Sequence, residues 1–355
     1  MKPALLFYCQ HSVGLGHLMR SYALCDRLAE RFDVTLLAGG QLPSDIPPPR
    51  GVRIVALPPL GMSAAGFGST DPRYTTERAW DVRLHRILDT VRDVRPKVVL
   101  VELYPFGRAK FTREIVPLLG AADDAFKACS LRDILVSGDA QRDDRARKLA
   151  DAHLDAILVH ADPRFARLEE TFKPPTPLSV PVHYTGFVTG REQADEPARG
   201  DHVVISAGGG RVGRPLLEEA IERLNGTPMR AIAGPLMPDE DFEALRRRAP
   251  RNVDLIRSVP DLAAELKRAA ASISQCGYNT ALDVVRARVP ALVVPYATPE
   301  EDEQTRRAQR LQDLGLVRVA DHVEPRLLDD FEPAPASLDL DGAATTRDLL
   351  YELIA

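Results

Sequence analysis

The stretch from residue 271 to residue 296, ASISQCGYNTALDVVRARVPALVVPY, carries the pattern that decides the fold. The apolar runs at 271–274 and 291–294 are typical of buried strands, and the segment 280–287 between them is expected to be a helix. Gly277 separates the first strand from this helix and permits a close turn. A strand, a helix and a second strand in this order predict a parallel sheet covered by helices.

The same alternation extends to both sides of this stretch. In the second half, strands are expected at 203–206, 229–233 and 253–256, and helices at 215–224, 239–249, 261–270 and 301–314. In the first half, strands are expected at 4–9, 34–38, 52–57, 98–102, 125–131 and 156–160, and helices at 18–32 and 76–94. Each half opens with a strand, a glycine turn and a helix, which predicts an α/β fold of two doubly wound, Rossmann-like domains.

The length of the chain also indicates two domains, because 355 residues exceed the ~250–300 at which a single core stops growing. Prolines between 174 and 181 mark the boundary, and 195–201 is the polar end of a linker. The predicted parts are a first domain at 1–185, a linker at 186–200, a second domain at 201–338 and a final helix at 339–355 that crosses back to the first domain. The aperiodic segment 61–74 is rich in small residues, which predicts a mobile loop near a site.

Composition excludes several classes of protein. Residues 321–355 hold nine acidic and two basic side chains, so the other 320 residues carry 44 basic and 42 acidic ones. This balance provides no large positive field, so nucleic acid is not an expected partner. The four cysteines are scattered and the first residues show no cleavage site, which favours a cytoplasmic protein without a disulfide scaffold or zinc site. No apolar run approaches the ~18 residues of a transmembrane helix.

Polar residues follow the glycine turns of the second half. The turn Gly208-Gly209-Gly210, with Arg211 beside it, is suited to hold a phosphate on backbone amides, although a simple tight turn remains the alternative. Asn279 and Thr280 begin the helix after Gly277 and can donate hydrogen bonds to a diphosphate. Asp283 follows one turn later on the same face, where a carboxylate can accept from ribose hydroxyls. Glu303 and Gln304 begin the next helix and could hold the hydroxyls of a sugar.

The first half offers a candidate base. His17 lies at the start of a helix after a loop containing Gly14 and Gly16, where a depressed pKa would suit a base near neutrality. The alternative is that His17 only caps the helix. This loop is a poor dinucleotide fingerprint, because the third glycine is absent and no acid ends the second strand. Glu102, which ends a strand, and Arg108 are either a functional pair that lines a cleft or a strand-end acid and a surface arginine. Arg132 lies just past a strand, and the alternative for it is a structural ion pair with Asp133.

Taken together, these segments resemble the nucleotide-sugar glycosyltransferases of the GT-B fold. Residues 275–283 are similar to the HCGWNS-through-Glu donor signature of the plant and natural-product enzymes, with Gln275 in place of histidine and Asp283 in place of glutamate. They are equally similar to family 28, which includes the N-acetylglucosaminyltransferase that forms peptidoglycan lipid II. Residues 303–308 match its Gln-x-x-Asn-Ala stretch except that Arg307 replaces the asparagine. Residues 14–20, 102–108 and 130–134 resemble a bacterial branch of predicted glycosyltransferases.

The resemblance implies two domains that face each other across a cleft, and a role for each matched residue. The residues that it assigns to the donor are Gly208, Gly209, Gly210, Gln275, Cys276, Gly277, Tyr278, Asn279 and Thr280 for the diphosphate, Asp283 for the ribose, Ser258 and Val259 for the uracil, and Glu303 and Gln304 for the sugar. His17 would be the acceptor-side base or the neighbour of that base, and Glu102 is the next candidate base. Gly14, Gly16, Arg108 and Arg132 would lie on the acceptor side.

The implied activity is inverting transfer from a UDP-sugar to the hydroxyl or amine of a small or lipid-linked acceptor, without a metal or other cofactor and with peripheral membrane contact allowed. Residues 16–20 also resemble a UDP-sugar hydrolase of pseudaminic acid synthesis, in which the histidine would activate water. A third hypothesis is a protein that binds a nucleotide-sugar without turnover. The identities of the acceptor and the donor sugar do not follow from the sequence.

Overall fold

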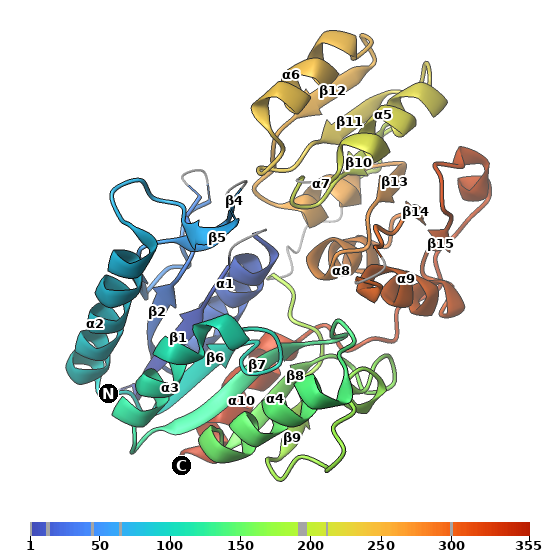
Figure 1. Cartoon of the computed structure of the whole chain (residues 1–355). Coiled ribbons are helices and arrows are strands. Elements are labelled where there is room, and N and C mark those ends of the chain that lie inside the picture. Colours follow the sequence, from blue (N-terminus) through green and yellow to red (C-terminus); the bar gives the residue numbers. More distant parts are fainter. Residues whose placement is uncertain are drawn as a thin grey trace. The chain divides into compact units, whose positions relative to one another are not determined.

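The computed structural model describes residues 2–11, 15–43, 46–63, 66–190, 197–210, 212–298 and 301–355. The chain divides into two compact units, one of Met1–Gly190 with Leu338–Ala355 and one of Arg191–Ser337. Each unit is a parallel sheet with helices on its faces (Figure 1). The prediction of an α/β chain with two doubly wound, Rossmann-like domains is therefore confirmed.

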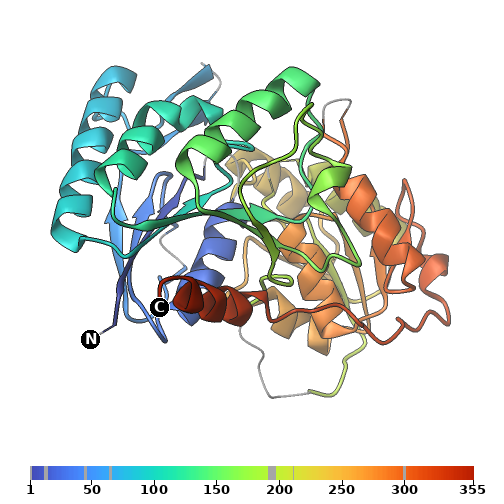
Figure 2. The ribbon, with the colours of Figure 1, turned by 90° about the horizontal axis from the view of Figure 1, so that it is seen from below.

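In the first unit, the described residues form a seven-stranded sheet in the order β3-β2-β1-β6-β7-β8-β9, with every pair parallel. The strands are β1 (Ala4–Cys9), β2 (Asp33–Ala38), β3 (Val52–Ala56), β6 (Val98–Glu102), β7 (Phe126–Arg132), β8 (Ala156–His160) and β9 (Val182–Tyr184). The helices are α1 (Gly16–Leu28), α2 (Thr76–Val94), α3 (Thr112–Ala121), α4 (Ala140–His153) and α10 (Gly342–Leu353), with short turns η1 (Ala109–Phe111) and η2 (Leu168–Glu170). Helices α1 and α10 cover one face of the sheet, and α2, α3 and α4 cover the other (Figure 2).

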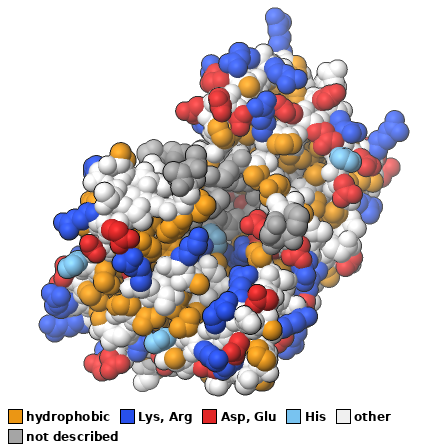
Figure 3. All heavy atoms as spheres, viewed as in Figure 1, with side chains coloured by type: hydrophobic (Ala, Val, Ile, Leu, Met, Phe, Trp, Pro, Cys, Tyr) orange, Lys and Arg blue, Asp and Glu red, His pale blue; other side chains and the backbone are white. Residues whose placement is uncertain are grey.

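In the second unit, a six-stranded parallel sheet has the order β12-β11-β10-β13-β14-β15 among the described residues. The strands are β10 (Val203–Ser206), β11 (Met229–Ile232), β12 (Val253–Ile256), β13 (Ala271–Ser274), β14 (Ala291–Val293) and β15 (Arg318–Val319). The helices are α5 (Arg214–Arg223), α6 (Asp239–Arg248), α7 (Leu262–Arg268), α8 (Tyr278–Ala287) and α9 (Glu303–Asp313), with the short turn η3 (Pro325–Leu328). Basic and acidic side chains alternate over the face of this unit seen in Figure 3.

The prediction of a loop over 61–74 is wrong at 61–63 and 66–69. Strands β4 (Leu60–Ser63) and β5 (Gly66–Ser69) pair antiparallel there. Phe67 of β5 packs against Trp80 of α2 and Phe111 of η1, with ring centroids 6.3 Å and 5.8 Å away. Aromatic contacts made outside the segment therefore stabilise strands whose small residues have weak strand propensity of their own.

A buried polar cluster joins three loops at the carboxyl edge of the first sheet. The guanidinium of Arg83, on α2, is fully buried and pairs with the carboxylate of Glu114, on α3. Its other N–H groups donate to the carbonyls of Gly39 and Pro58, each at 2.8 Å, and to Oε1 of Gln10 at 2.7 Å. These bonds satisfy a buried charge and connect the ends of β1, β2 and β3.

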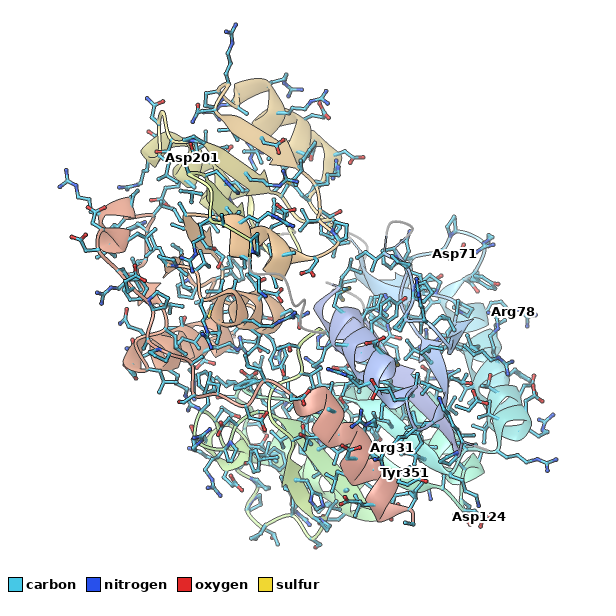
Figure 4. The ribbon with its side chains drawn as sticks, turned by 180° about the vertical axis from the view of Figure 1, so that it is seen from behind. Arg31, Asp71, Arg78, Asp124, Asp201 and Tyr351 are labelled. Carbon is cyan, nitrogen blue, oxygen red and sulfur yellow. The ribbon has the colours of Figure 1, made fainter. Side chains whose placement is uncertain are left out.

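The last helix belongs to the first unit. Ala343 and Leu350 of α10 are buried in the same apolar cluster as Leu24 and Leu28 of α1. On the outer side, the guanidinium of Arg31 lies over the ring of Tyr351, 4.9 Å from its centroid (Figure 4). Apolar burial thus attaches the chain terminus to the first helix of the fold.

Candidate functional site

The first set of candidate residues lies where the strand order of the first sheet reverses. Strands β1 and β6 are neighbours, yet the chain connects β1 to β2 on one side and β6 to β7 on the other. Ligands of open α/β sheets bind beyond the carboxyl ends of the strands at such a switch point. His17 follows β1, in the first turn of α1, and Glu102 is the last residue of β6. The parallel pairing of β1 with β6 therefore brings together two residues that are 85 positions apart.

Glu102 is fully buried and is surrounded by three basic side chains. Its Oε1 lies 2.7 Å from Nδ1 of His17 and also accepts a hydrogen bond from the guanidinium of Arg20. Its Oε2 lies 3.5 Å from Nη2 of Arg108. Burial alone would raise the pKa of this carboxyl, but His17, Arg108 and Arg20 together hold the pKa of Glu102 well below its usual range. Glu102 is therefore ionised at neutral pH.

The ionised carboxylate decides which tautomer His17 adopts. A carboxylate only accepts hydrogen bonds, so Nδ1 of His17 must carry the proton and Nε2 is left with its lone pair. Burial, assisted by Arg108 and Arg20 and opposed by Glu102, lowers the pKa of His17 to about 4. The ring is then neutral at physiological pH. Its side chain is 24% exposed, so a substrate can reach it.

Helix capping does not account for His17. The residue that caps α1 is Leu15, and no side-chain hydrogen bond is made at this cap. Gly16 begins α1, and Gly14 lies outside the described residues. Arg132 ends β7 and is half-buried, while Arg108 reaches Glu102. Sequence reasoning missed Arg20 as a site residue, although its spacing of three from His17 places both on one face of a helix.

A cavity of about 410 Å³ lies at the same edge of the first sheet, beyond the ends of β2 and β3. The segment 70–74, which follows the β4–β5 hairpin, forms one of its walls. Its volume is within the ~300–1,000 Å³ that is usual for ligand pockets. The lining residues are Gly40, Gln41, Leu42, Ala56, Leu57, Pro58, Pro59, Thr70, Asp71, Pro72, Arg73, Tyr74 and Arg86.

The second set of candidate residues lies at the switch point of the second sheet, between β10 and β13. The turn after β10 needs its glycines, because Gly208 and Gly210 have φ of +59° and +89°. A Cβ on Gly210 would lie 2.5 Å from the carbonyl oxygen of Ala233, so the turn packs backbone against backbone. Gly209 has open space at its Cβ position, and Arg211 lies outside the described residues. Sequence reasoning did not select Gly234, the opposing glycine with φ of +91°.

The turn after β13 lies beside this glycine turn. The N–H of Gln275 donates to the carbonyl of Ser206 at 3.4 Å, and a Cβ on Gly208 would be 3.8 Å from Oγ1 of Thr280. Gly277 caps α8 without any side-chain hydrogen bond, and Tyr278 and Asn279 are its first residues. A helix leaves its first N–H groups without intrahelical partners and carries a partial positive charge at this end. An anion is thus electrostatically favoured between the two turns.

Asp283 and the start of α9 flank the same turn. Burial raises the pKa of the half-buried Asp283 to about 7, although Arg286 opposes this shift. Oε1 of Gln304 accepts from the N–H of Cys276 at 2.9 Å and from that of Tyr296 at 3.2 Å, so this side chain holds the loop itself. Glu303 precedes it as the first residue of α9.

The remaining donor-side candidates are further along the sheet. Ser258 and Val259 are half-buried and follow β12, which is the edge strand two positions from β10. Arg307, which sequence reasoning noted only as a departure from a signature, is fully buried and donates to the carbonyl of Cys276. Within the described ranges, no group of three or more His, Cys, Asp or Glu side chains could hold a metal ion. In this same part of the chain, no helix combines the length and apolarity needed to cross a membrane.

Comparison with known proteins finds similarity to glycosyltransferases. Residues 232–326 match the glycosyltransferase family 28 C-terminal domain. An uncharacterized glycosyltransferase of Methanosarcina mazei is 24% identical over 341 residues, covering 90% of this chain and 86% of its own.

Two solved structures share the fold over nearly their whole length. MurG of Acinetobacter baumannii superposes with a TM-score of 0.58 at 16% identity, covering 99% of this chain and 100% of its own. A UDP-glucosyltransferase from Polygonum tinctorium superposes with a TM-score of 0.58 at 14% identity, covering 100% and 98%. The chain thus has the GT-B fold and carries a glycosyltransferase family 28 C-terminal domain over residues 232–326.

Proposed function

We propose that this glycosyltransferase moves a sugar from a UDP-sugar to a hydroxyl or amine of an acceptor, with inversion at the anomeric carbon and without a metal ion. The observation that carries this proposal is the pair formed by His17 and the buried, ionised Glu102. Nε2 of His17 is oriented as a base by the hydrogen bond at Nδ1, and the carboxylate stabilises the imidazolium that forms when a proton is taken up.

In the proposed reaction, Nε2 of His17 removes the proton of the acceptor hydroxyl. The oxygen of this hydroxyl attacks the anomeric carbon of the donor sugar at the same time. The bond between that carbon and the diphosphate oxygen breaks, and UDP departs with the electron pair. Attack opposite to the leaving group inverts the configuration. Arg20 and Arg108 keep Glu102 ionised, which in turn keeps His17 in the tautomer that can accept this proton.

On the donor side, we assign the diphosphate to the turns at 208–210 and 275–280. The partial positive charge at the start of α8 attracts its oxygens, and the glycine turn after β10 allows the backbone to approach them closely. Asp283 would accept from the ribose hydroxyls, and Glu303 would hold the sugar. Because helix ends and buried donors can stabilise a departing diphosphate, a metal ion is not required by this arrangement.

The proposal of UDP draws on the donor-side residues and on the fold neighbour named a UDP-glucosyltransferase. We further propose that the cavity beyond β2 and β3 accommodates the part of the acceptor remote from its reacting group. Its wall carries aromatic and basic groups on Tyr74, Arg73 and Arg86. Such a lining suits an acceptor with an apolar body and an anionic or hydroxyl-rich end.

Two measurements test the proposed function. Isothermal titration with UDP, GDP and TDP is expected to give heat with UDP, and absence of heat with all three would overturn the donor site. Incubation with UDP-sugars and a metabolite extract, followed by mass spectrometry, is expected to reveal a product heavier by one sugar. Release of UDP and free sugar in the absence of any acceptor would instead identify a hydrolase in which His17 activates water.

A further inference from the structure

Arg307 lies fully buried on α9, at a position where the related donor signatures have asparagine. Its Nη1 donates to the carbonyl of Cys276 at 2.8 Å, and its guanidinium is 5.8 Å from the ring centroid of Tyr278. Three residues earlier on the same helix, Gln304 accepts from the N–H of Cys276. Helix α9 therefore holds the N–H and the carbonyl of one residue through two side chains one turn apart.

The residue that is held in this way directly precedes the cap of α8. Gly277, with φ of −62° and ψ of 152°, is extended and makes no side-chain cap, so the helix start depends on neighbouring segments for its orientation. The hydrogen bond from Arg307 orients the carbonyl of Cys276 and with it the following peptide group. Arg307 thus contributes to the direction in which the first amides of α8 point.

Arg307 also places a positive charge next to the Cys276–Gly277 turn. A guanidinium does not lose its proton in proteins, so the side chain remains cationic whatever its hydrogen bonds. The hydrogen bond to Cys276 places this charge a few ångströms from the partial positive charge of the helix end. Asparagine at this position would provide a hydrogen-bond donor but no charge. Because the side chain is buried, its field is little screened by salt.

We propose that Arg307 is a positioning residue for the donor diphosphate, which it favours by orienting the Cys276–Gly277 turn and by supplying a buried positive charge beneath it. This inference rests on the proposed function, because it requires that a nucleoside diphosphate is bound at the start of α8. The guanidinium of Arg307, next to the Cys276–Gly277 turn, would then stabilise the two phosphates in the absence of a metal ion. Binding of the nucleoside part alone is not expected to depend on Arg307.

The test compares how tightly the protein holds ligands that differ only in phosphate. UDP, UMP and uridine are titrated into the wild-type protein, R307M and R307K, with uridine measured by competition against UDP. Arg306, which is half exposed on the same helix and pairs with Asp302, provides the matched control R306M. In R307M we expect UDP to bind about tenfold more weakly, corresponding to ~1.4 kcal/mol, with uridine unchanged within twofold. R306M is expected to retain wild-type affinity for both.

R307K retains the charge and loses the planar guanidinium, and it is the variant to use if R307M does not fold. We expect it to weaken UDP binding two- to fivefold with uridine unchanged within twofold, so the preference for UDP falls less than in R307M. Equal loss of UDP and uridine affinity in either variant would show a purely structural role and overturn the inference. UDP affinity unchanged in R307M would overturn it as well. Absence of UDP binding to the wild-type protein would overturn the proposed donor site and this inference together.

Discussion

Nδ1 of His17 lies 2.7 Å from Oε1 of Glu102, and this hydrogen bond joins the first helix of the fold to the end of a central strand. Glu102 is fully buried and ionised, and His17 is partly exposed and neutral. The pair thus combines a fixed buried acceptor with a basic nitrogen that a substrate can approach. Most of the chemical expectations for the first unit depend on this relationship.

Replacement of His17 by alanine is expected to reduce turnover by a factor of ~10²–10⁴, because the acceptor proton would no longer have a positioned base. UDP affinity should remain nearly unchanged, since the donor residues lie in the other unit. Steady-state kinetics and titration with UDP measure the two quantities. His85→Ala on the exposed face of α2 is the control, and near-normal turnover of His17→Ala would remove this residue from the reaction.

The pH profile should reflect the lowered pKa of His17. Because burial lowers this pKa from 6.5 to about 4, the ring remains neutral as pH falls through 6, and kcat/KM should decline only as the pH approaches 4. The measurement is kcat/KM between pH 4 and pH 8, limited to conditions under which the protein remains folded. A decline centred near 6.5 would mean that His17 titrates as an ordinary exposed histidine.

Replacement of Glu102 by glutamine is expected to affect both stability and activity. It removes the carboxylate that pairs with the buried Arg20, and loss of one partner of a buried ion pair costs about 3–5 kcal/mol. The amide can also hold His17 in the wrong tautomer, so turnover should fall by ~10²-fold or more. Denaturant unfolding and kinetics of the folded fraction separate the two effects. Unchanged values of both would contradict the role given to this pair.

Asp283→Ala should weaken UDP binding by roughly 1–3 kcal/mol by leaving ribose hydroxyls unpaired. Because burial raises the pKa of Asp283 to about 7, the carboxyl is neutral below this pH and becomes a better acceptor above it. Wild-type affinity relative to Asp283→Asn should therefore increase from pH 6 to pH 8. This comparison removes the contribution of the phosphate's own titration. An unchanged dissociation constant in Asp283→Ala would exclude this residue from the site.

Truncation after residue 338 removes α10 and should lower the melting temperature without abolishing UDP binding. The helix buries Leu350 completely against α1, and a fully buried leucine contributes about 1.5–3 kcal/mol. Leu353→Ala, at an exposed position of the same helix, is the control for Leu350→Ala. If the truncated chain melts at the wild-type temperature, α10 does not contribute to stability.

Gly210→Ala should destabilise the second unit more than Gly226→Ala. Both residues have positive φ, +89° and +85°, so both substitutions incur about 1–2 kcal/mol of backbone strain. Gly226 has open space at its Cβ position, whereas the Cβ of residue 210 would meet the carbonyl of Ala233 at 2.5 Å. The difference between the two variants in unfolding free energy isolates this contact. Equal losses would show that the turn can move away from Ala233.

The sequence by itself determined the elements whose signals are local. Several elements agree with the predicted ranges to the residue: strands Ala4–Cys9, Val98–Glu102 and Ala271–Ser274 and helix Thr76–Val94. Each of them is a continuous apolar run or a periodic segment bounded by turn residues. The loop containing His17 and the turn before Tyr278 were recognisable for the same reason. Glycine and polar residues after a buried strand predict a ligand site at the carboxyl edge of a parallel sheet.

Tertiary structure decided what depends on strand order and burial. Strands β4 and β5 pair because Phe67 packs against aromatic rings from later elements, which no local pattern encodes. In the sequence, Arg20 and Arg307 lie on expected helices and have no assigned role, and only folding buried them against Glu102 and Cys276. A buried arginine must find an acceptor, and which one it finds depends on segments that are distant in the chain. Local periodicity therefore determined the elements, and the long-range pairing of β1 with β6 and of β10 with β13 determined which side chains meet.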